Sequence, residues 1–239
     1  MLNISERKDP WWLEWVLMTS ALTVFMGYSG WATFQGNNYQ FGPYRSPFYP
    51  FDFSIGNLSP AIFIFWIPVL FRLTCYYWRN IYYRSYLLDP AGCAVNEFPR
   101  GYDGERKFPF VLLNFHRYFV YLAIVLLFIH WKETFHSFTY QGRFGLGVGN
   151  MILLFDSVVI TIYVFSCHAL RHLFGGRVRK FSCSSCTKLG HSVWKLNTIF
   201  NERHGIWAWI SLVSVIVADL YIRLLAQGVI TDINTWRNF

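Results

Sequence analysis

Charged side chains are scarce in this chain of 239 residues, where Asp, Glu, Lys and Arg make up 14% against ~25% in ordinary soluble domains. Aromatic residues, by contrast, make up 21%. Together these values exclude a typical soluble domain and indicate a chain whose surroundings are partly lipid. The formal net charge of +8 would suit either nucleic acid or an anionic membrane surface. Because the positive side chains flank apolar segments, we favour the membrane and expect no nucleic-acid partner.

The sequence also has no internal repeats and no low-complexity segments, and its number of cysteines is not even. Five cysteines are an odd number, mostly near basic loops, so a disulfide framework is not expected and thiolate metal ligands become candidates. The first apolar segment is longer than a signal-peptide core and has no small-residue cleavage site after it. We therefore expect a single retained membrane domain over residues 1–239.

Five stretches have the ~20 mostly apolar residues that a helix needs to cross a membrane. They cover about 11–34, 58–78, 109–130, 150–174 and 204–227. Their edges are rich in Trp and Tyr, as is typical of membrane–water interfaces. Each stretch contains polar residues, and an ionisable group in lipid is expected to face the bundle interior, reach the interface or serve a function. The sequence predicts an all-α integral membrane protein with five transmembrane helices.

Lysine and arginine are divided unequally between the two predicted sides. The N-terminal side, with segments 1–10, 76–108 and 171–204, has 14, and the opposite side, with 35–57, 131–149 and 228–239, has 4. Because cytoplasmic loops have the excess of these residues, we expect the N-terminus in the cytoplasm, the C-terminus outside and a multi-pass location in the cell (cytoplasmic or inner) membrane.

The predicted loops differ in kind. Loop 35–57 is rich in Gly, Pro and Tyr, so we expect a compact cap over the bundle. Loop 76–108 begins with tyrosines and arginines that suit a docking surface and can prolong the second helix into the cytoplasm. Loop 175–203 is basic and contains Cys183 and Cys186. These two cysteines resemble a zinc half-site, but no second pair with suitable spacing follows.

The predicted topology brings most histidines and cysteines to the cytoplasmic half of the membrane. Of the remaining residues, Cys93 lies in the loop on that side, whereas His130 and His136 lie toward the other side. The cytoplasmic group is Cys75, His116, Cys167, His168, His172 and His204.

Two cysteines and two histidines are ligands for zinc or for a Rieske-type [2Fe–2S] centre, and facing histidines also ligate haem. A single buried histidine is more often a hydrogen-bonding group, and a buried cysteine is more often a small apolar filler. We interpret Cys167 as such an apolar filler. Asp219 and Arg223 are four residues apart, and we expect a structural ion pair there.

Motifs throughout the chain are RLTCYYWR at 72–79, DPAGCAV at 89–95, NFHRYF at 114–119 and SCHALRHLFGG at 166–176, with GPYRSPFY at 42–49, NERH at 201–204 and ADLY at 218–221. In these stretches the sequence resembles the cytochrome b-like membrane anchor of respiratory complex II, the succinate dehydrogenase and fumarate reductase group. The resemblance is to the single-anchor type of actinobacteria and relatives, in which a membrane-embedded Rieske-type cluster replaces haem.

The resemblance implies a five-helix anchor bound to two soluble subunits of succinate:quinone oxidoreductase. One is a flavoprotein with FAD, and the other contains further iron–sulfur clusters. The anchor would pass electrons through its [2Fe–2S] cluster to a quinone, menaquinone or ubiquinone, without independent catalysis. Assembly of the heterotrimer into an oligomer stays open.

The resemblance also implies a ligand set. Cys75 and Cys93 match the thiolate candidates, His116 matches one imidazole candidate, and either His168 or His172 matches the other. His204 then becomes a supporting residue. Relatives often have a cysteine between the last two histidine positions, where this chain has Ala-Leu-Arg, so a cysteine there is dispensable as a ligand. The spacing of Cys75 and Cys93 differs from that of soluble Rieske domains.

A quinone needs an apolar slot with a few donors for its carbonyl oxygens. Tyr44, Ser46 and Tyr49 are candidates if the site lies on the outer side, and a cytoplasmic site is the rival. Arg72 and Arg117 can steady the quinone or offset the negative charge of a cluster.

Three alternatives stay open. The same anchor can hold haem b between its histidines. A small proton or solute transporter would use Asp156, Asp219 and the histidines, although no paired halves are visible. A purely structural scaffold would leave the one-sided grouping of His and Cys without a reason.

Overall fold

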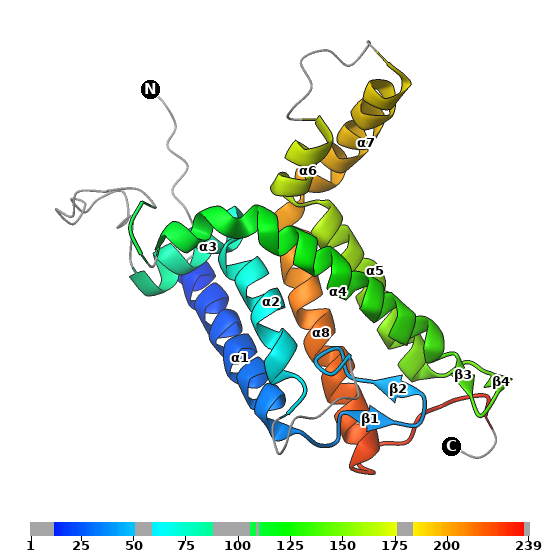
Figure 1. Cartoon of the computed structure of the whole chain (residues 1–239). Coiled ribbons are helices and arrows are strands. Elements are labelled where there is room, and N and C mark those ends of the chain that lie inside the picture. The colour runs from blue at the N-terminus through cyan, green and yellow to red at the C-terminus, as the bar shows by residue number, and fades with distance from the viewer. Residues whose placement is uncertain (1–11, 51–58, 88–105, 109, 176–183, 237–239) are drawn as a thin grey trace, which may run out of the picture.

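The computed structural model describes residues 12–50, 59–87, 106–108, 110–175 and 184–236 (Figure 1). The described part is mostly helical, which confirms the predicted all-α class, with two short β-hairpins. The helices are α1 (Leu13–Gln35), α2 (Ile62–Leu73), α3 (Tyr76–Tyr82), α4 (His116–His136), α5 (Val148–Phe165), α6 (His168–Gly175), α7 (Ser185–Asn201) and α8 (His204–Ala226). A π-helix (Tyr83–Leu87) follows α3, and a 3-10 helix (Phe110–Phe115) precedes α4.

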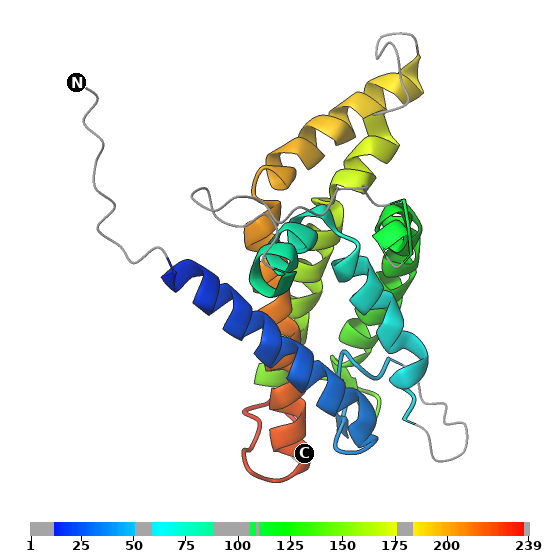
Figure 2. The same ribbon diagram turned by 90° about the vertical axis from the view of Figure 1, so that its left-hand side faces the viewer.

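Five of these helices, α1, α2, α4, α5 and α8, run past one another and form the body of the molecule (Figures 1 and 2). Helix α5 packs most extensively on α8, and α4 packs on both α2 and α5. Helices α3, α6 and α7 gather at one end of the body. The opposite end has the hairpins β1 (Gln40–Phe41) with β2 (Tyr44–Arg45) and β3 (Thr139–Tyr140) with β4 (Arg143–Phe144).

Within the described residues, three helical segments are long and apolar enough to cross a membrane: Val111–His136, Val148–Phe165 and His204–Ala226. Helix α2 is apolar but has 12 residues, and α1 has 23 residues with less apolar composition. The last two predicted spans therefore match membrane-length helices closely at one or both ends. Five crossings and the sides on which the termini lie stay predictions.

Two predicted continuous spans are in fact interrupted. Residues 58–78 were expected as one helix, but Cys75 has extended backbone angles (φ −66°, ψ 132°) between α2 and α3. Residues 150–174 likewise divide where α5 ends at Phe165. The carbonyl oxygens freed at this second break accept bonds from α7: Asn197 donates to Phe165, and Asn201 donates to Ser166 at 2.7 Å. Hydropathy does not register such breaks, because their partners are distant in the sequence.

The sequence predicts a loop over residues 175–203, but the second half of this segment forms helix α7. Ser184 caps this helix by accepting a hydrogen bond from the backbone N–H of Thr187. Helix α7 then returns along α6, with the Arg171 guanidinium 4.4 Å from the centre of the Trp194 ring. The residues of 176–183, including Cys183, lie outside the described part, and Cys186 is exposed on the first turn of α7.

The predicted compact cap is confirmed for the described residues of loop 35–57. The β1–β2 hairpin packs on α8, and Tyr44 is fully buried against α5. Its hydroxyl donates to Asp232 at 2.7 Å. The chain comes so close here that a Cβ atom on Gly149 would lie 2.6 Å from the Tyr44 ring. Burial first, and then the hydrogen bond to Asp232, raise the pKa of Tyr44 far above its usual value, so this hydroxyl stays a donor.

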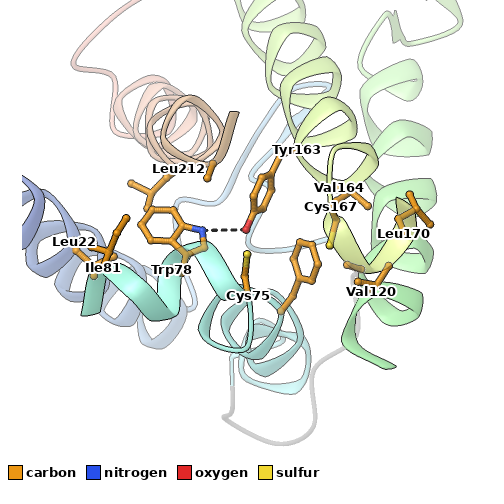
Figure 3. Packing of buried hydrophobic residues seen from close by; sticks show 13 residues of the cluster. Leu22, Cys75, Trp78, Ile81, Val120, Tyr163, Val164, Cys167, Leu170 and Leu212 are labelled. Carbon is orange, nitrogen blue, oxygen red and sulfur yellow. Dashed lines mark hydrogen bonds between the residues drawn. The ribbon is translucent and has the colours of Figure 1, made fainter. Parts of the chain in front are cut away.

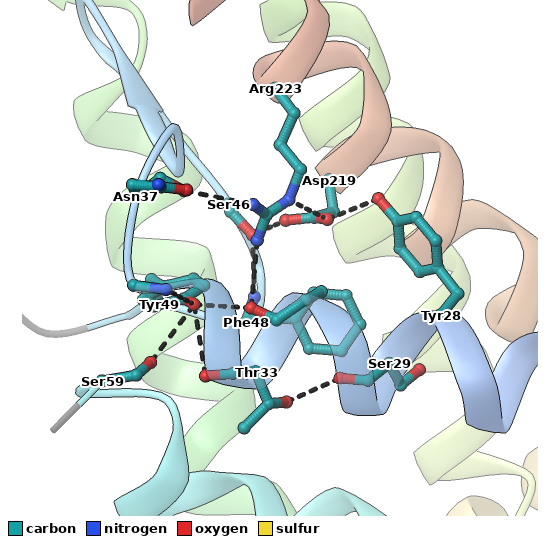
Figure 4. Close-up of polar contacts among 12 residues, drawn as sticks. Tyr28, Ser29, Thr33, Asn37, Ser46, Phe48, Tyr49, Ser59, Asp219 and Arg223 are labelled. Atoms are coloured by element: carbon teal, nitrogen blue, oxygen red, sulfur yellow. Dashed lines mark hydrogen bonds and ion pairs between the residues drawn. The ribbon is translucent and has the colours of Figure 1, made fainter.

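The predicted Asp219–Arg223 ion pair is confirmed at 2.7 Å, with both side chains almost completely buried. Figure 4 shows how the pair joins the cap to α1 and α8. Ser46 and Tyr28 donate hydrogen bonds to the Asp219 carboxylate, the second at 2.6 Å. Arg223 donates to the carbonyl oxygens of Ala32 and Asn37 at the end of α1. Every charged atom in this network therefore has a partner.

We predict that Arg223→Met destabilises the protein by about 3–5 kcal/mol, because it leaves the Asp219 carboxylate buried without its counter-charge. Lys132→Ala is the control, since Lys132 is 78% exposed and lies 3.8 Å from Glu133, so a change of about 0–1 kcal/mol is expected. The midpoint of thermal unfolding of the detergent-solubilised protein measures both. Equal shifts for the two variants would contradict the proposed importance of the buried pair.

Gly149→Ala is expected to cost about 1–3 kcal/mol, the range for overpacking a filled site, because the new methyl group displaces Tyr44. Gly27→Ala is a matched control: Gly27 is also helical, and a Cβ atom there meets nothing within 4 Å. This control should be neutral or stabilising by up to about 1 kcal/mol. Protection of the cap against proteolysis reports the difference, and an unprotected cap in the control variant would count against the packing argument.

Candidate functional site

Four residues meet at the level where helices begin or break. Cys75 lies in the break between α2 and α3, and Cys167 lies in the break between α5 and α6. His116 is the first residue of α4, and His204 is the first residue of α8. The cysteines are 3% and 1% exposed. We name Cys75, His116, Cys167 and His204 the Cys/His cluster.

The Cys/His cluster consists of two mixed pairs. His116 Nε2 lies 3.1 Å from Cys167 Sγ, and His204 Nε2 lies 3.5 Å from Cys75 Sγ. Two aromatic rings join the pairs: Phe71, next to His116, packs edge-on against Tyr163, next to His204, with ring centroids 5.5 Å apart. In each histidine the other ring nitrogen has a hydroxyl partner. These are Thr74 for His116, at 2.9 Å, and Ser166 for His204, at 2.7 Å.

Aromatic rings surround the Cys/His cluster. The Phe71 ring stacks on His116 with centroids 5.2 Å apart, and the Tyr163 ring stacks on His204 at 5.1 Å. Trp78 donates a hydrogen bond to the Tyr163 hydroxyl at 3.0 Å. Figure 3 shows Cys75 beside Trp78 and Tyr163, and Cys167 beside Val164 in the same buried cluster. Water is therefore largely excluded, and the imidazole rings are held in fixed orientations.

A positive charge lies beside the Cys/His cluster. The Arg72 guanidinium is 4.8 Å from the centre of the Tyr163 ring and donates to Ser211 at 3.1 Å. Helices α6 and α8 also begin at the cluster, and the N-terminal end of a helix has a partial positive charge. These features favour a negatively charged group at this level.

The structure brings together only part of the ligand set expected from the sequence. Cys75 and His116 lie in the Cys/His cluster, whereas Cys93 lies outside the described residues. His168 and His172 are exposed on α6. Arg117, on α4, lies 3.4 Å from His172 Nδ1 and is exposed as well, so it lies apart from the cluster.

Sequence reasoning gave Cys167 and His204 minor tasks that their contacts do not support. Cys167 was interpreted as an apolar filler, but its sulfur contacts an imidazole nitrogen. The sequence predicts a supporting residue at His204, but its Nε2 lies 3.5 Å from Cys75 Sγ. This is close to the 3.1 Å between His116 Nε2 and Cys167 Sγ. One signal was available for His204, which begins the predicted span 204–227 next to Arg203, whereas Cys167 lies inside the predicted span 150–174.

Within the part of the chain that the structure describes, no group of three or more His, Cys, Asp or Glu side chains is gathered around a point where one metal ion could bind. The Cys/His cluster instead offers two thiols and two imidazoles in pairs. That donor set has the chemistry of a binuclear iron–sulfur centre with mixed ligands, in which each iron takes two protein ligands.

The residues expected beside a quinone, Tyr44, Ser46 and Tyr49, are all buried. Tyr49 donates to the carbonyl oxygen of Ala32 at 2.6 Å, and the other two bind Asp232 and Asp219 as described above. These hydroxyl groups attach the cap to the bundle. Their predicted contact with a quinone stays a prediction.

A cavity of about 150 Å³ lies between the Cys/His cluster and the cap, bordered by α1, α2, α4, α5 and α8. Its walls are mostly apolar, and they include Phe71, Arg72 and Tyr163 at the cluster and Pro47 in the cap. His130 also borders it. The cavity therefore connects the level of the Cys/His cluster with the opposite half of the bundle.

Residues 13–228 match the family model of the actinobacterial succinate dehydrogenase subunit SdhC. Among solved structures, the chain is similar to one described as the Mycobacterium smegmatis Sdh1 complex in the apo form, with 33% sequence identity and a TM-score of 0.85. This match covers 95% of the present chain and 92% of the other. No match was found among curated proteins.

The burial of the cluster thiols predicts their reactivity. Cys75 and Cys167 should react with N-ethylmaleimide only after denaturation, whereas exposed Cys186 should react in the native protein, because alkylation needs access to the sulfur. Peptide mapping by mass spectrometry measures each site separately. Equal labelling rates for Cys75 and Cys186 in the native protein would show that the cluster is open to water.

Proposed function

Because the chain belongs to the family of actinobacterial succinate dehydrogenase SdhC subunits, we propose that it passes electrons to a quinone as the membrane anchor of succinate:quinone oxidoreductase. The chain is a multi-pass protein of the cytoplasmic membrane, with apolar membrane-length helices. The observation that supports an electron-transfer role is the Cys/His cluster, which has no role in a simple anchor.

The partners of the anchor are a flavoprotein subunit and an iron–sulfur subunit. We expect them on the cytoplasmic side, at the end formed by α3, α6 and α7. Arg117 and His172 are exposed there, and Arg79 on α3 lies over the Tyr76 ring at 4.7 Å. Such exposed arginine and aromatic side chains are typical of protein interfaces. The five crossings and the cytoplasmic N-terminus belong to this proposal.

The donor set fits a Rieske-type [2Fe–2S] centre. In such a centre two thiolates bind one iron and two imidazoles bind the other. The sulfur and the imidazole of each mixed pair would therefore bind different irons, Cys75 and Cys167 one iron, and His116 and His204 the other. When bound, the centre supplies one-electron transfer at a potential raised by its imidazole ligands. The chain contributes burial, the charge of Arg72 and the hydroxyl groups of Thr74 and Ser166, which orient the two imidazoles.

The ligand set expected from the resemblance is thereby revised. Cys75 and His116 keep their roles. We propose His204 in place of His168 or His172, because His204 contacts Cys75 whereas both α6 histidines are exposed. We propose Cys167 as a thiolate because it contacts His116. Cys93 lies outside the described residues, and its match through the resemblance stays a prediction.

Haem b between the histidines is the alternative cofactor. Each imidazole already has an aromatic ring stacked on one face, with centroids 5.2 and 5.1 Å apart, which supports the smaller centre. An optical spectrum of the purified complex separates the two possibilities, because haem gives a strong Soret band and the iron–sulfur centre does not.

We expect Cys167→Ser and His204→Gln to remove the signal of the anchor cluster in electron paramagnetic resonance and to lower the iron content by two per complex, since each iron loses a protein ligand. Reduction of quinone by succinate should fall by at least about 100-fold, as expected when a centre in an electron relay is lost. Cys186→Ser and His172→Gln are the matched controls, because both side chains are exposed.

Three other results would contradict this ligand set, the centre or the anchor role. Loss of the signal in His172→Gln with retention in His204→Gln would restore the ligand set expected from the resemblance. Retention in all four variants would exclude this centre, and purification of the chain without any flavoprotein would exclude the anchor role itself.

A further inference from the structure

We propose that quinone is protonated in the cavity between the Cys/His cluster and the cap, and that His130 donates the proton while Asp156 positions its ring. This inference rests on the proposed function, since it concerns the quinone site of the same anchor. It assigns a catalytic residue on the half of the bundle opposite the soluble subunits.

The cavity has the chemistry of a quinone headgroup site. A quinone presents a flat apolar ring and two carbonyl oxygens that accept hydrogen bonds. The lining is apolar except for four side chains: Ser29, Arg72, His130 and Tyr163. Arg72 and Tyr163 belong to the surroundings of the Cys/His cluster, which leaves Ser29 and His130 as donors farther from it. Pro68, which also lines the cavity, is exposed on the face of α2, so an apolar ligand can enter from lipid.

Ser29 is an independent sign that a ligand belongs here. Its side chain lies on α1 and is 2% exposed, and its hydroxyl oxygen has no hydrogen-bond partner among the described residues. A buried hydroxyl without a partner costs about 1–3 kcal/mol. A carbonyl oxygen in the cavity would satisfy it.

His130 faces a buried carboxylate, and neither of the two facing atoms, His130 Nε2 and Asp156 Oδ2, makes a hydrogen bond among the described residues. Its Nε2 lies 3.2 Å from Asp156 Oδ2, and Asp156 is completely buried. Ser214 donates to the other carboxylate oxygen at 2.5 Å. A carboxylate in a lipid-surrounded bundle needs a counter-charge, and the facing imidazole of His130 is a group that gains a positive charge when it binds a proton. Asp156 contacts Nε2, so we assign the proton transfer to the second ring nitrogen, Nδ1.

His130 lies on the same helix, α4, as His116 of the Cys/His cluster. It lies 14 residues after His116 on α4, a rise of about 21 Å along the helix. The cavity borders Phe71 and Tyr163, which stack on the cluster imidazoles. A quinone ring bound at His130 therefore lies at the end of the cavity away from the Cys/His cluster, and electrons would cross the part of the cavity that Phe71 and Tyr163 border.

The reaction balances. Succinate loses two electrons and two protons to become fumarate, and the quinone gains two electrons and two protons to become quinol. His130 Nδ1 gives one proton to a carbonyl oxygen, and this forms an O–H bond as the N–H bond breaks. Neutral His130 regains a proton from water, and water supplies the second proton at the other carbonyl oxygen.

The experiment uses the purified complex and compares two acceptors: a short-chain quinone, and ferricyanide, which takes electrons from the soluble subunits. We expect His130→Gln to lower kcat for quinone by about 100-fold or more, the usual effect of a general acid. KM for quinone should change by less than about 3-fold, because glutamine keeps a hydrogen-bond donor. Ferricyanide reduction should be unchanged. His136→Gln, an exposed histidine on the same helix, is the matched control.

Asp156 acts through His130, so its variants are tested by the same measurements: kcat and KM for quinone, and the rate of ferricyanide reduction. Asp156→Asn should lower kcat without raising KM, and Asp156→Glu should recover part of kcat because it restores the carboxylate. A merely structural role for Asp156 would lower both reactions together.

A second variant tests the cavity without touching the proton donor. Ala123 lines the cavity, and Ala123→Phe fills it, so the quinone extracted from the purified complex should fall to a small fraction of the wild-type amount. Val125→Phe is the control, since Val125 is 56% exposed on the outer face of α4.

The outcomes separate this inference from the proposed function. Normal quinone reduction by His130→Gln, or full quinone content in Ala123→Phe, would overturn the inference and leave the anchor role intact. Absence of succinate oxidation with both acceptors in the wild-type preparation would overturn the proposed function instead.

Discussion

A chain in lipid must satisfy every backbone hydrogen bond within the protein, and in this molecule that constraint governs two broken helices. The break after α5 frees the carbonyl oxygens of Phe165 and Ser166, which Asn197 and Asn201 on α7 then bind. Helix α7 is therefore more than a connection between α6 and α8. It makes the break stable, and the break in turn allows Cys167 to leave the helical path.

Breaks and helix starts are what bring the Cys/His cluster together. A residue inside a continuous helix keeps its side chain on one face, whereas residues at ends can approach from several directions. Cys75 and Cys167 use breaks, and His116 and His204 use starts. The same arrangement aims the positive ends of α6 and α8 at the cluster. The breaks and helix starts thus bring together the four side chains of the proposed centre and the positive ends of two helices.

The opposite half of the bundle contains two buried carboxylates with different surroundings. Asp219 is neutralised by Arg223 and by two further donors, an arrangement that holds the cap in place. Among the described residues, Asp156 meets His130 and Ser214, and a histidine can change its charge where an arginine cannot. The cavity lies beside the histidine pair. The stabilising pair and the proposed proton-donating pair thus use separate carboxylates.

Composition and hydropathy by themselves determined the membrane class, the helices α4, α5 and α8, the cap and the Asp219–Arg223 pair, because each depends on neighbouring residues or on regular spacing. The motifs determined the family for the same reason. Only the tertiary structure decided which histidines and cysteines meet. His172 is closer in sequence to Cys167 than His116 is, yet the kink after α5 turns His172 outward. Contacts among side chains from four helices depend on where helices break, and the partners that stabilise a break lie too far along the chain for a local pattern to register.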